Sequence, residues 1–321
     1  MKNLFFFDSE GFNGSSDDKI ISTAEKLSEK YNIILWSNDL LMGALAKAKG
    51  ILVKKHELLM QENKIYTGVT YGDNECKFQN QYNINKSGIY RFCDNDCVRL
   101  PKDKKIWGIK HRNAEQKCVF DALLDDSIKL VTISGRAGTG KTLLAIAAGL
   151  EKTVNEEVYD RLLVSRPIVP MGHDMGFLPG DVNEKLSPWM QPIFDNIDYL
   201  FNNSKEKRQN DQWKTLEQQG LLKLEALTYI RGRSIPNQFI IIDEAQNLTP
   251  HEVKTIISRA GEGTKVVLTG DPEQIDSLRL NAKNNGLTYT IEKFKEYKIA
   301  AHVTLIKGER SDLADLAAEI L

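Results

Sequence analysis

Apolar positions near the start of the chain repeat at helical spacing. Asp17 and Asp18 precede apolar side chains at positions 20, 21, 24 and 27, and this spacing predicts an amphipathic helix that begins after the two aspartates. A short apolar run at 32–36 predicts a strand, and residues 41–48 repeat the helical spacing. We expect residues 1–56 to form an α/β segment that is too short to be a layered domain of its own.

Residues 57–105 have a different pattern. They are polar, rich in Asn, Lys and Tyr, and contain strand-like runs at 64–70 and 88–91. We therefore predict a small β-rich connector. A structural zinc site takes four ligands and only three thiols lie here, so free cysteines are favoured over zinc ligation for Cys76, Cys93 and Cys97.

From residue 106 to 321, continuous apolar runs alternate with helical segments. Runs without polar alternation are typical of parallel strands in an α/β sheet with helices on both faces. All nine prolines lie between Pro101 and Pro272, which sets this region apart from the first hundred residues. The predicted strands are residues 129–134, 161–164, 238–243, 265–270 and 302–306.

A phosphate-binding loop is the clearest motif. Residues 135–142 match G-x-x-x-x-G-K-[ST] completely and stand between a predicted strand and a predicted helix. Glycines let backbone N–H groups face phosphate oxygens, and the helix N-terminus adds positive partial charge. Lys141 is expected to neutralise the β- and γ-phosphates, and the Thr142 hydroxyl to bind Mg²⁺. The predicted cradle is Gly135, Arg136, Ala137, Gly138, Thr139, Gly140, Lys141 and Thr142.

Two carboxylates end another apolar run. Residues 239–242 read Phe-Ile-Ile-Ile, and Asp243 and Glu244 follow directly. Asp243 is expected to hold Mg²⁺ through water, and Glu244 to orient or deprotonate the attacking water. The alternative is a surface acidic pair, which the preceding buried-type strand disfavours.

Three further side chains are candidates for the same site. Gln274 lies in a loop after the strand at 265–270, where it could sense the γ-phosphate. Arg310 follows the last strand and could stabilise transition-state charge. The alternative for Gln274 is a turn with a polar tip, and the alternative for Arg310 is a salt-bridged arginine on the surface. Gln116 could read the adenine edge, although its chemistry alone leaves this undecided.

Composition narrows the classes of protein. The chain has 321 residues, of which 41% are hydrophobic and 27% charged, and its formal net charge is −1. This balance predicts a globular protein without a broad basic surface, so any nucleic-acid site must be a local patch. No apolar run approaches the roughly 18 residues that span a bilayer. We expect a soluble cytoplasmic protein with no membrane partner.

Residues 107–321 resemble the ATPase domain of the PhoH family. The matching segments include HRNAEQ, ISGRAGTGKTLLAIAAGL, FIIIDEAQNLTP, VVLTGDPEQID and KGERSDLADLAAEIL. The resemblance implies a RecA-like P-loop NTPase fold, ATP and Mg²⁺ as cofactors, and roles at the nucleotide for Gln116, Gln274 and Arg310. Residues 277–283 depart from the Asn-Pro-Tyr-Leu-like stretch usual in the family, so this loop is expected to differ in conformation or contacts.

Residues 1–56 resemble the last third of a PIN nuclease domain. A PIN site gathers three or four carboxylates around metal ions, and this segment offers two candidates, Asp18 and Asp39. The family's first strand, with its opening aspartate, has no counterpart here. We therefore expect no independent nuclease activity, and helix capping is the alternative role for both aspartates.

A single RecA-like lobe leaves the γ-phosphate side of the nucleotide open. We expect a neighbouring copy of the chain to close it, and the family resemblance implies a homo-oligomer in the form of a hexameric ring. Residues 166–193 hold five prolines and several aromatic residues. They could line a path for single-stranded RNA or form a proline-stiffened packing loop. The cations proposed to contact RNA are Arg166, Lys185, Arg231 and Arg233.

Two classes of function remain. The first, which we predict, is an RNA-directed, helicase-like ATPase. The alternative is an ATP-dependent assembly or switch protein that acts on a protein partner. A kinase fits less well, because Glu244 and Gln274 suit water activation better than an acceptor hydroxyl.

Overall fold

The chain forms two compact units, Met1–Lys64 and Ile65–Leu321. The computed structural model describes residues 16–37, 40–54, 65–167, 182–203, 212–227, 230, 232–277 and 280–308. Within those ranges, no helix is both long enough and apolar enough to cross a membrane.

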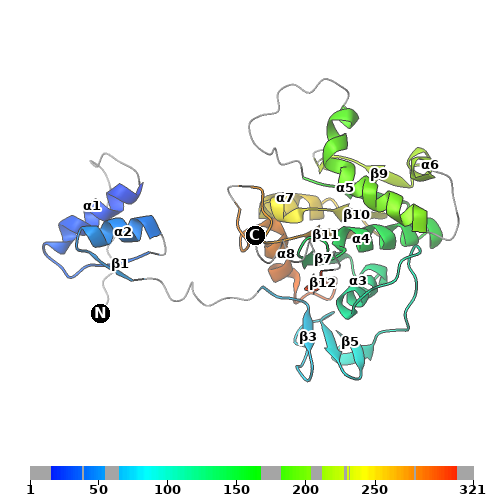
Figure 1. Cartoon of the computed structure of the whole chain (residues 1–321), viewed down its shortest axis with the longest axis horizontal. Coiled ribbons are helices and arrows are strands. Elements are labelled where there is room, and N and C mark those ends of the chain that lie inside the picture. Colours follow the sequence, from blue (N-terminus) through cyan, green and yellow to red (C-terminus); the bar gives the residue numbers. More distant parts are fainter. Residues whose placement is uncertain are drawn as a thin grey trace. The chain divides into compact units, whose positions relative to one another are not determined.

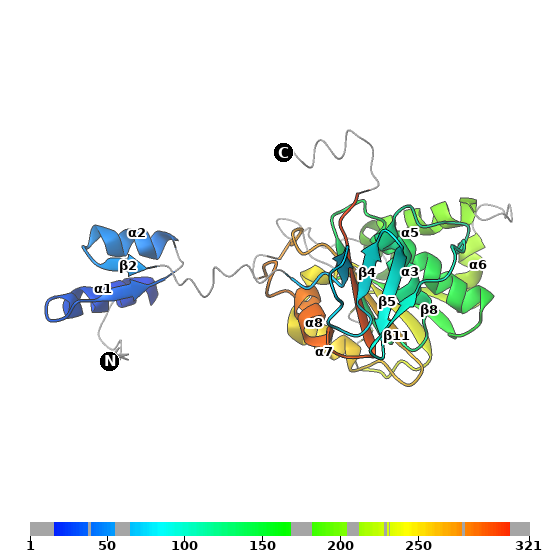
Figure 2. The same ribbon diagram turned by 90° about the horizontal axis from the view of Figure 1, so that it is seen from below.

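The first unit is a small α/β arrangement (Figure 1, Figure 2). Its two strands pair in parallel. The helices cover them through a core of Ile21, Ala24, Ala46 and Ile51. The predicted order of helix, strand and helix is confirmed, and a second strand follows. The elements are α1 (Ser16–Ser28), β1 (Ile34–Trp36), α2 (Leu40–Ala48) and β2 (Leu52–Lys54).

A six-stranded parallel sheet forms the centre of the second unit. Its strand order is β12-β7-β11-β10-β8-β9, so β11 separates the strand of the phosphate loop from the strand of the acidic pair. All five predicted strands are present. The strands are β7 (Leu130–Gly135), β8 (Arg161–Ser165), β9 (Leu222–Leu224), β10 (Gln238–Ile242), β11 (Lys265–Gly270) and β12 (Ala300–Leu305).

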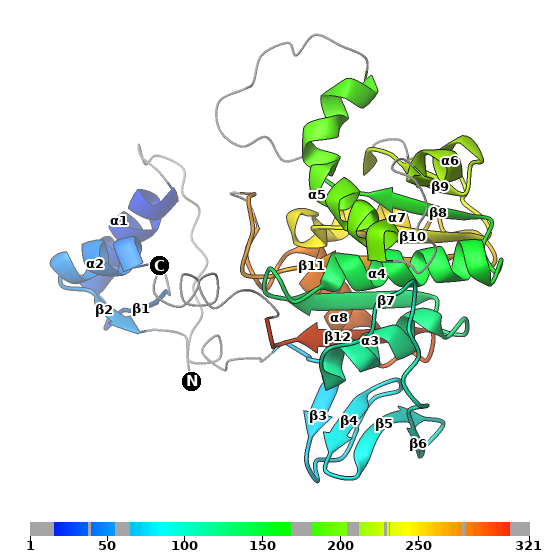
Figure 3. The ribbon, with the colours of Figure 1, turned by 45° about the vertical axis from the view of Figure 1, so that its right-hand side comes forward.

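Helices cover both faces of this sheet, as the unbroken apolar runs predict (Figure 3). Successive residues of β10 point to opposite faces: Phe239 and Ile241 pack in one core, and Ile240 and Ile242 in the other. The first core includes α3 (Ala114–Leu124), α4 (Lys141–Leu150) and α5 (Val182–Asn203). The second includes α7 (Pro250–Ile257) and α8 (Gly286–Phe294). A P-loop NTPase-like α/β fold results.

Three short helical pieces and an edge strand complete this unit. The π-helical turn Glu151–Asn155 extends α4, and a 3-10 turn spans Ala245–Asn247 after β10. Helix α6 (Gln212–Gln218) precedes β9, which pairs with β8 at the edge of the sheet. The sequence pattern did not predict β9, because three residues are too few to show a period.

A second, four-stranded sheet packs against α3 (Figure 3). Strands β3 and β4 are parallel, and the other two pairs are antiparallel. This sheet belongs to the same compact unit as the six-stranded sheet. Its strands are β3 (Val69–Tyr71), β4 (Tyr82–Asn85), β5 (Gly88–Cys93) and β6 (Asp96–Arg99).

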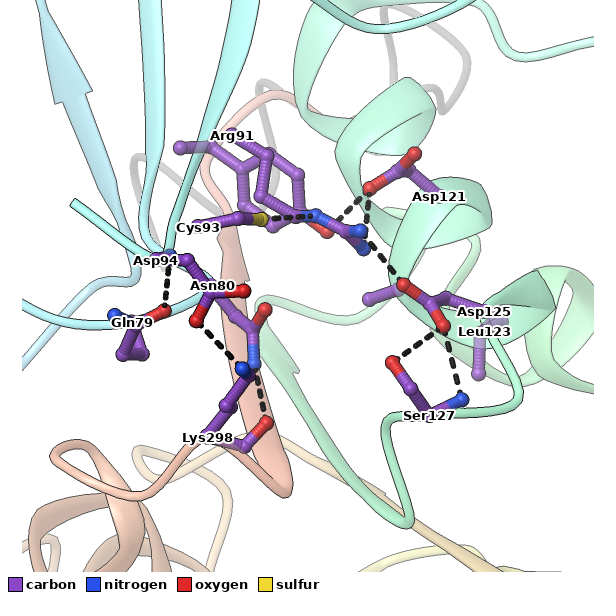
Figure 4. A network of polar contacts seen from close by, with 12 residues as sticks. Gln79, Asn80, Arg91, Cys93, Asp94, Asp121, Leu123, Asp125, Ser127 and Lys298 are labelled. Atoms are coloured by element: carbon purple, nitrogen blue, oxygen red, sulfur yellow. Dashed lines mark hydrogen bonds and ion pairs between the residues drawn. The ribbon is translucent and has the colours of Figure 1, made fainter. Parts of the chain in front are cut away.

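Polar contacts tie the small sheet to the larger one (Figure 4). Arg91 on β5 lies 3.0 Å from Asp121 and 2.6 Å from Asp125, the residues at the end of α3. The Asn80 amide donates to the carbonyls of Lys298 and Ala300 at 2.9 and 2.8 Å. The Arg91 contacts fix the small sheet to α3, the helix that carries Gln116, and the Asn80 contacts fix it to the start of β12.

The predicted strand at 64–70 is wrong in extent, because β3 covers only Val69–Tyr71. Gly68 has a φ of +73°, which interrupts the extended backbone. A Cβ at Gly68 would lie 1.7 Å from the carbonyl oxygen of His302, so only glycine allows this close approach. The preceding Thr67 instead accepts a hydrogen bond from the Thr304 backbone on β12.

Candidate active site

The phosphate loop links the carboxyl end of β7 to the N-terminus of α4. Gly138 and Gly140 have φ values of +80° and +89°, a region that glycine reaches without strain. Gly135 passes Leu305 so closely that a Cβ would lie 2.4 Å from its carbonyl oxygen. The motif glycines therefore shape the loop and let it run beside β12.

Lys141 folds back over this loop. Its Nζ donates to the carbonyl oxygens of Gly135 at 2.7 Å and Arg136 at 3.0 Å. The ammonium group is thereby held at the helix N-terminus, where anionic phosphate oxygens are favoured. Thr139 is buried and braces the same turn by donating its hydroxyl to the Arg136 carbonyl.

Thr142 and Asp243 meet directly. The Thr142 hydroxyl donates to Asp243 Oδ1 at 2.8 Å, and the Thr269 hydroxyl on β11 donates to the same oxygen at 2.6 Å. Asp243 is only 4% exposed and lies just after β10, which ends at Ile242. The strand predicted at 238–243 is therefore one residue shorter in the structure.

This pair fits a magnesium ion. Mg²⁺ prefers oxygen ligands, keeps several waters, and is usually held by one or two protein oxygens together with substrate phosphates. Thr142 and Asp243 offer a hydroxyl and a carboxylate beside the loop that would hold those phosphates. They would bind Mg²⁺ directly or through water.

Glu244 stands next to this pair in a left-handed backbone conformation, with φ 53° and ψ 39°. Such a conformation costs free energy in a non-glycine residue and is often found at functional sites. Its carboxylate accepts a hydrogen bond from Gln246 Nε2 and lies 3.6 Å from the Arg166 guanidinium. Arg166 directly follows β8, so the ends of β7, β8, β10 and β11 all contribute to the site.

Gln246, which the sequence motifs did not single out, connects Glu244 to the loop after β11. It is fully buried; its Nε2 also donates to the Gln274 carbonyl at 2.8 Å, and its Oε1 accepts from the Asp271 N–H at 3.1 Å. A Cβ at Gly270 would lie 2.2 Å from that Oε1. Its place in the segment FIIIDEAQNLTP, two residues after Glu244, was the sequence signal, whereas its partners Asp271 and Gln274 are distant in sequence.

Gln116 is placed against the phosphate loop. Its Nε2 donates to the Thr139 carbonyl at 3.1 Å, and its Oε1 accepts from the Arg112 N–H at 2.7 Å. The backbone N–H of Gln116 is capped by the Asn113 side chain at the start of α3. Gln116 therefore ties the start of α3 to the phosphate loop at Thr139.

The neighbouring Glu115 joins three parts of the second unit. The Tyr71 hydroxyl on β3 donates to it at 2.6 Å, and the Ile306 N–H after β12 donates to its other oxygen at 3.1 Å. Burial, together with the bond to Glu115, raises the pKa of Tyr71, so the phenol stays protonated as a donor. The small sheet thus contacts the helix that carries Gln116 and the end of β12.

The remaining predicted residues have different surroundings. The Gln274 side chain is exposed, whereas its backbone joins the Gln246 network. Arg233 pairs with the buried Glu225. Asp18 lies in the first turn of α1 and not before the helix, in the other compact unit. Asp39, Arg231, Arg310 and the side chain of Lys185 lie outside the residues that the structure describes.

A family model for PhoH-like protein matches residues 108–319. The chain belongs to the PhoH-like protein family. Protein PhoH2 of Bacillus subtilis is 44% identical over an alignment that covers 96% of this chain and 78% of that protein. Protein PhoH2 of Thermobispora bispora is 33% identical and covers 96% and 75% of the two chains.

Among solved structures, the Pif1 helicase of Candida albicans is similar over 66% of this chain and 43% of that chain, with 15% identity and a TM-score of 0.35. Membership of the PhoH-like family and the complete phosphate loop make this protein a P-loop enzyme that binds and hydrolyses nucleoside triphosphates.

Proposed function

We propose that this PhoH-like protein hydrolyses ATP with Mg²⁺ and that single-stranded RNA accelerates the reaction. The observation that carries the proposal is the hydrogen bond between Thr142 and Asp243 beside the phosphate loop, with the Glu244 carboxylate on the next residue. A metal-binding pair and a potential base are brought together there at the carboxyl edge of one parallel sheet.

Each side chain has a distinct task. The loop N–H groups and Lys141 bind the β- and γ-phosphates. Thr142 and Asp243 hold Mg²⁺, which when bound neutralises the charge that develops on those phosphates. Glu244 orients the attacking water and accepts its proton, while the Gln246 bond keeps the carboxylate in place.

Arg166 would couple RNA binding to the Glu244 carboxylate. It opens segment 166–193, for which we propose RNA contacts, and its guanidinium lies 3.6 Å from Glu244. While the pair is formed, Arg166 competes with the attacking water for the Glu244 carboxylate. If an RNA phosphate takes over Arg166, the Glu244 carboxylate becomes free to accept a proton from water.

We further propose that a second copy of the chain closes the γ-phosphate side, with Arg310 reaching the nucleotide, in a ring of six subunits. The resemblance of the GER segment at residues 308–310 to the family motif supports this role. Light scattering should therefore show an assembly, and turnover per subunit should fall on dilution. A monomer with concentration-independent turnover would contradict the closure by a second copy.

The direct test is ATP turnover measured with and without single-stranded RNA at several salt concentrations. We expect RNA to raise turnover at low salt and to lose this effect as salt rises, because phosphate contacts weaken with ionic strength. ATP turnover that ignores RNA, together with no RNA retention at low salt, would reject the RNA-directed function and favour a switch acting on a protein partner.

A further inference from the structure

A cavity of about 600 Å³ opens beside the phosphate loop. Its volume lies within the range of small-molecule sites. Gly138 and Gly140 of the loop form one side, and Gln116 lies next to them. Helix α5 forms another wall, although it plays no part in the phosphate chemistry described above.

Helix α5 has two distinct faces in this region. Its buried face holds Ile193, Ile197 and Leu200, which pack in the core shared with α4. The face that lines the cavity carries Asn196, Tyr199 and Asn203, spaced three and four residues apart. The periodicity of the helix therefore directs an aromatic ring and two amides into the cavity.

Tyr199 is the aromatic group of this wall. It is 45% exposed, so its ring is available for contact. The position of α5 is fixed nearby, because Phe201 meets Trp107 edge to face with ring centroids 5.8 Å apart. Leu143 and Ile109 line the same cavity and add apolar surface.

We propose that this cavity takes the base of a purine nucleotide and that Tyr199 stacks on it. This inference rests on the proposed function, because the loop must hold the phosphates of the same molecule. Gly138 and Gly140 belong to the loop and also line the cavity, so a nucleotide with its phosphates in the loop would have this space for its ribose and base. Stacking on an aromatic face with apolar surface around it favours the larger purine ring.

Gln116 retains the capacity to recognise the edge of this base. A side-chain amide has two N–H donors and two acceptor lone pairs. The bonds to the Thr139 carbonyl and the Arg112 N–H use one of each. The remaining donor and acceptor match the edge of a purine, so Tyr199 and Gln116 together would position the base.

Calorimetric titration with ADP, GDP, CDP, UDP and pyrophosphate tests this site without requiring hydrolysis. For the wild type we expect ADP and GDP to bind more tightly than CDP and UDP. Tyr199→Ala should weaken ADP binding about tenfold, since stacking of a base on an aromatic ring contributes about 1–3 kcal/mol. Tyr199→Phe should bind ADP as the wild type does, and pyrophosphate affinity should not change in either variant.

Tyr289→Ala is the matched control, because Tyr289 is also 45% exposed but lies on α8 outside this cavity. It should bind ADP normally. ADP affinity that stays within about twofold in Tyr199→Ala would overturn the inference while leaving ATP hydrolysis intact. Failure of the wild type to bind either ADP or pyrophosphate would overturn both the base site and the proposed function.

Discussion

The Thr142 hydroxyl and the Asp243 carboxylate are 101 residues apart in the chain and form a 2.8 Å hydrogen bond. Strand β11 lies between the strands that lead to them, and its Thr269 bonds to the same carboxylate oxygen. The carboxylate is therefore oriented toward the phosphate loop by two hydroxyls. This arrangement gives the neighbouring side chains specific and separable roles.

Replacing Lys141 by Ala should abolish measurable ATP hydrolysis, with a loss of about 100-fold or more, because an electrostatic contact to the transferring phosphoryl group disappears. Steady-state phosphate release measures this loss. Lys254→Ala, an exposed lysine on α7, is the control and should keep wild-type turnover. Near-normal turnover of the Lys141 variant would refute the assignment of the loop.

Replacing Glu244 by Gln should leave ATP binding intact and slow hydrolysis by about 10²- to 10⁴-fold, since an amide cannot accept the proton of water. Binding and single-turnover hydrolysis are measured on the same preparation. The exposed Glu273→Gln in the loop after β11 serves as the control and should hydrolyse ATP normally. Equal losses in both variants would argue against a base at position 244.

Replacing Arg166 by Ala should raise basal turnover and reduce the response to RNA. The 3.6 Å ion pair between Arg166 and Glu244 is partly exposed, so breaking it changes the free energy by at most about 1 kcal/mol. This corresponds to a roughly fivefold increase in basal turnover. Turnover with and without RNA measures both effects. Unchanged basal turnover together with full RNA stimulation would disprove the coupling.

Replacing Gly270 by Ala should destabilise the protein by about 1–3 kcal/mol, because the new methyl group would overlap Gln246 Oε1. Urea unfolding measures the change. In the double variant with Gln246→Ala, the methyl group gains space, so the two changes should be less than additive. Strict additivity would show that the two positions do not interact.

Stability should fall between about pH 6.5 and pH 4 because of His302. Its ring is fully buried between β7 and β12, and this burial lowers its pKa to about 4. The unfolded chain binds the proton first, so the stabilising contribution is present above the unfolded pKa and is lost as pH falls toward the folded pKa. The loss attributable to this group is about 3 kcal/mol.

Urea unfolding from pH 7 to pH 4.5 tests this, with His302→Asn as the comparison. Asparagine cannot take up the proton but can still bond to the backbone of Thr132, which lies 3.0 Å from the ring nitrogen. The stability difference between wild type and variant should shrink as pH falls. A difference that is constant with pH would exclude His302 as the titrating group.

The sequence alone determined the local parts of the nucleotide site. The order strand, Gly-rich loop, Lys141, Thr142 and helix is a contiguous pattern, and so is the apolar run before Asp243. Unbroken apolar runs also predicted five of the six strands of the large sheet, since burial on both faces leaves no polar alternation to obscure them. The sequence did not predict the short strand β9 or the ends of β3, because pairing with β8 and β4 determines where these strands begin and end.

Tertiary structure decided which of these parts meet. The strand order brings Thr142 to Asp243, and the turns after β8 and β10 bring Arg166 and Gln246 to Glu244. Gln246 in turn bonds to the Gln274 carbonyl in the loop after β11. It also placed Tyr199 of α5 on the cavity beside the loop, although nothing near position 199 resembles a nucleotide motif. Local spacing specifies helices and strands, whereas hydrogen bonds and packing between distant segments fix the neighbours of each side chain.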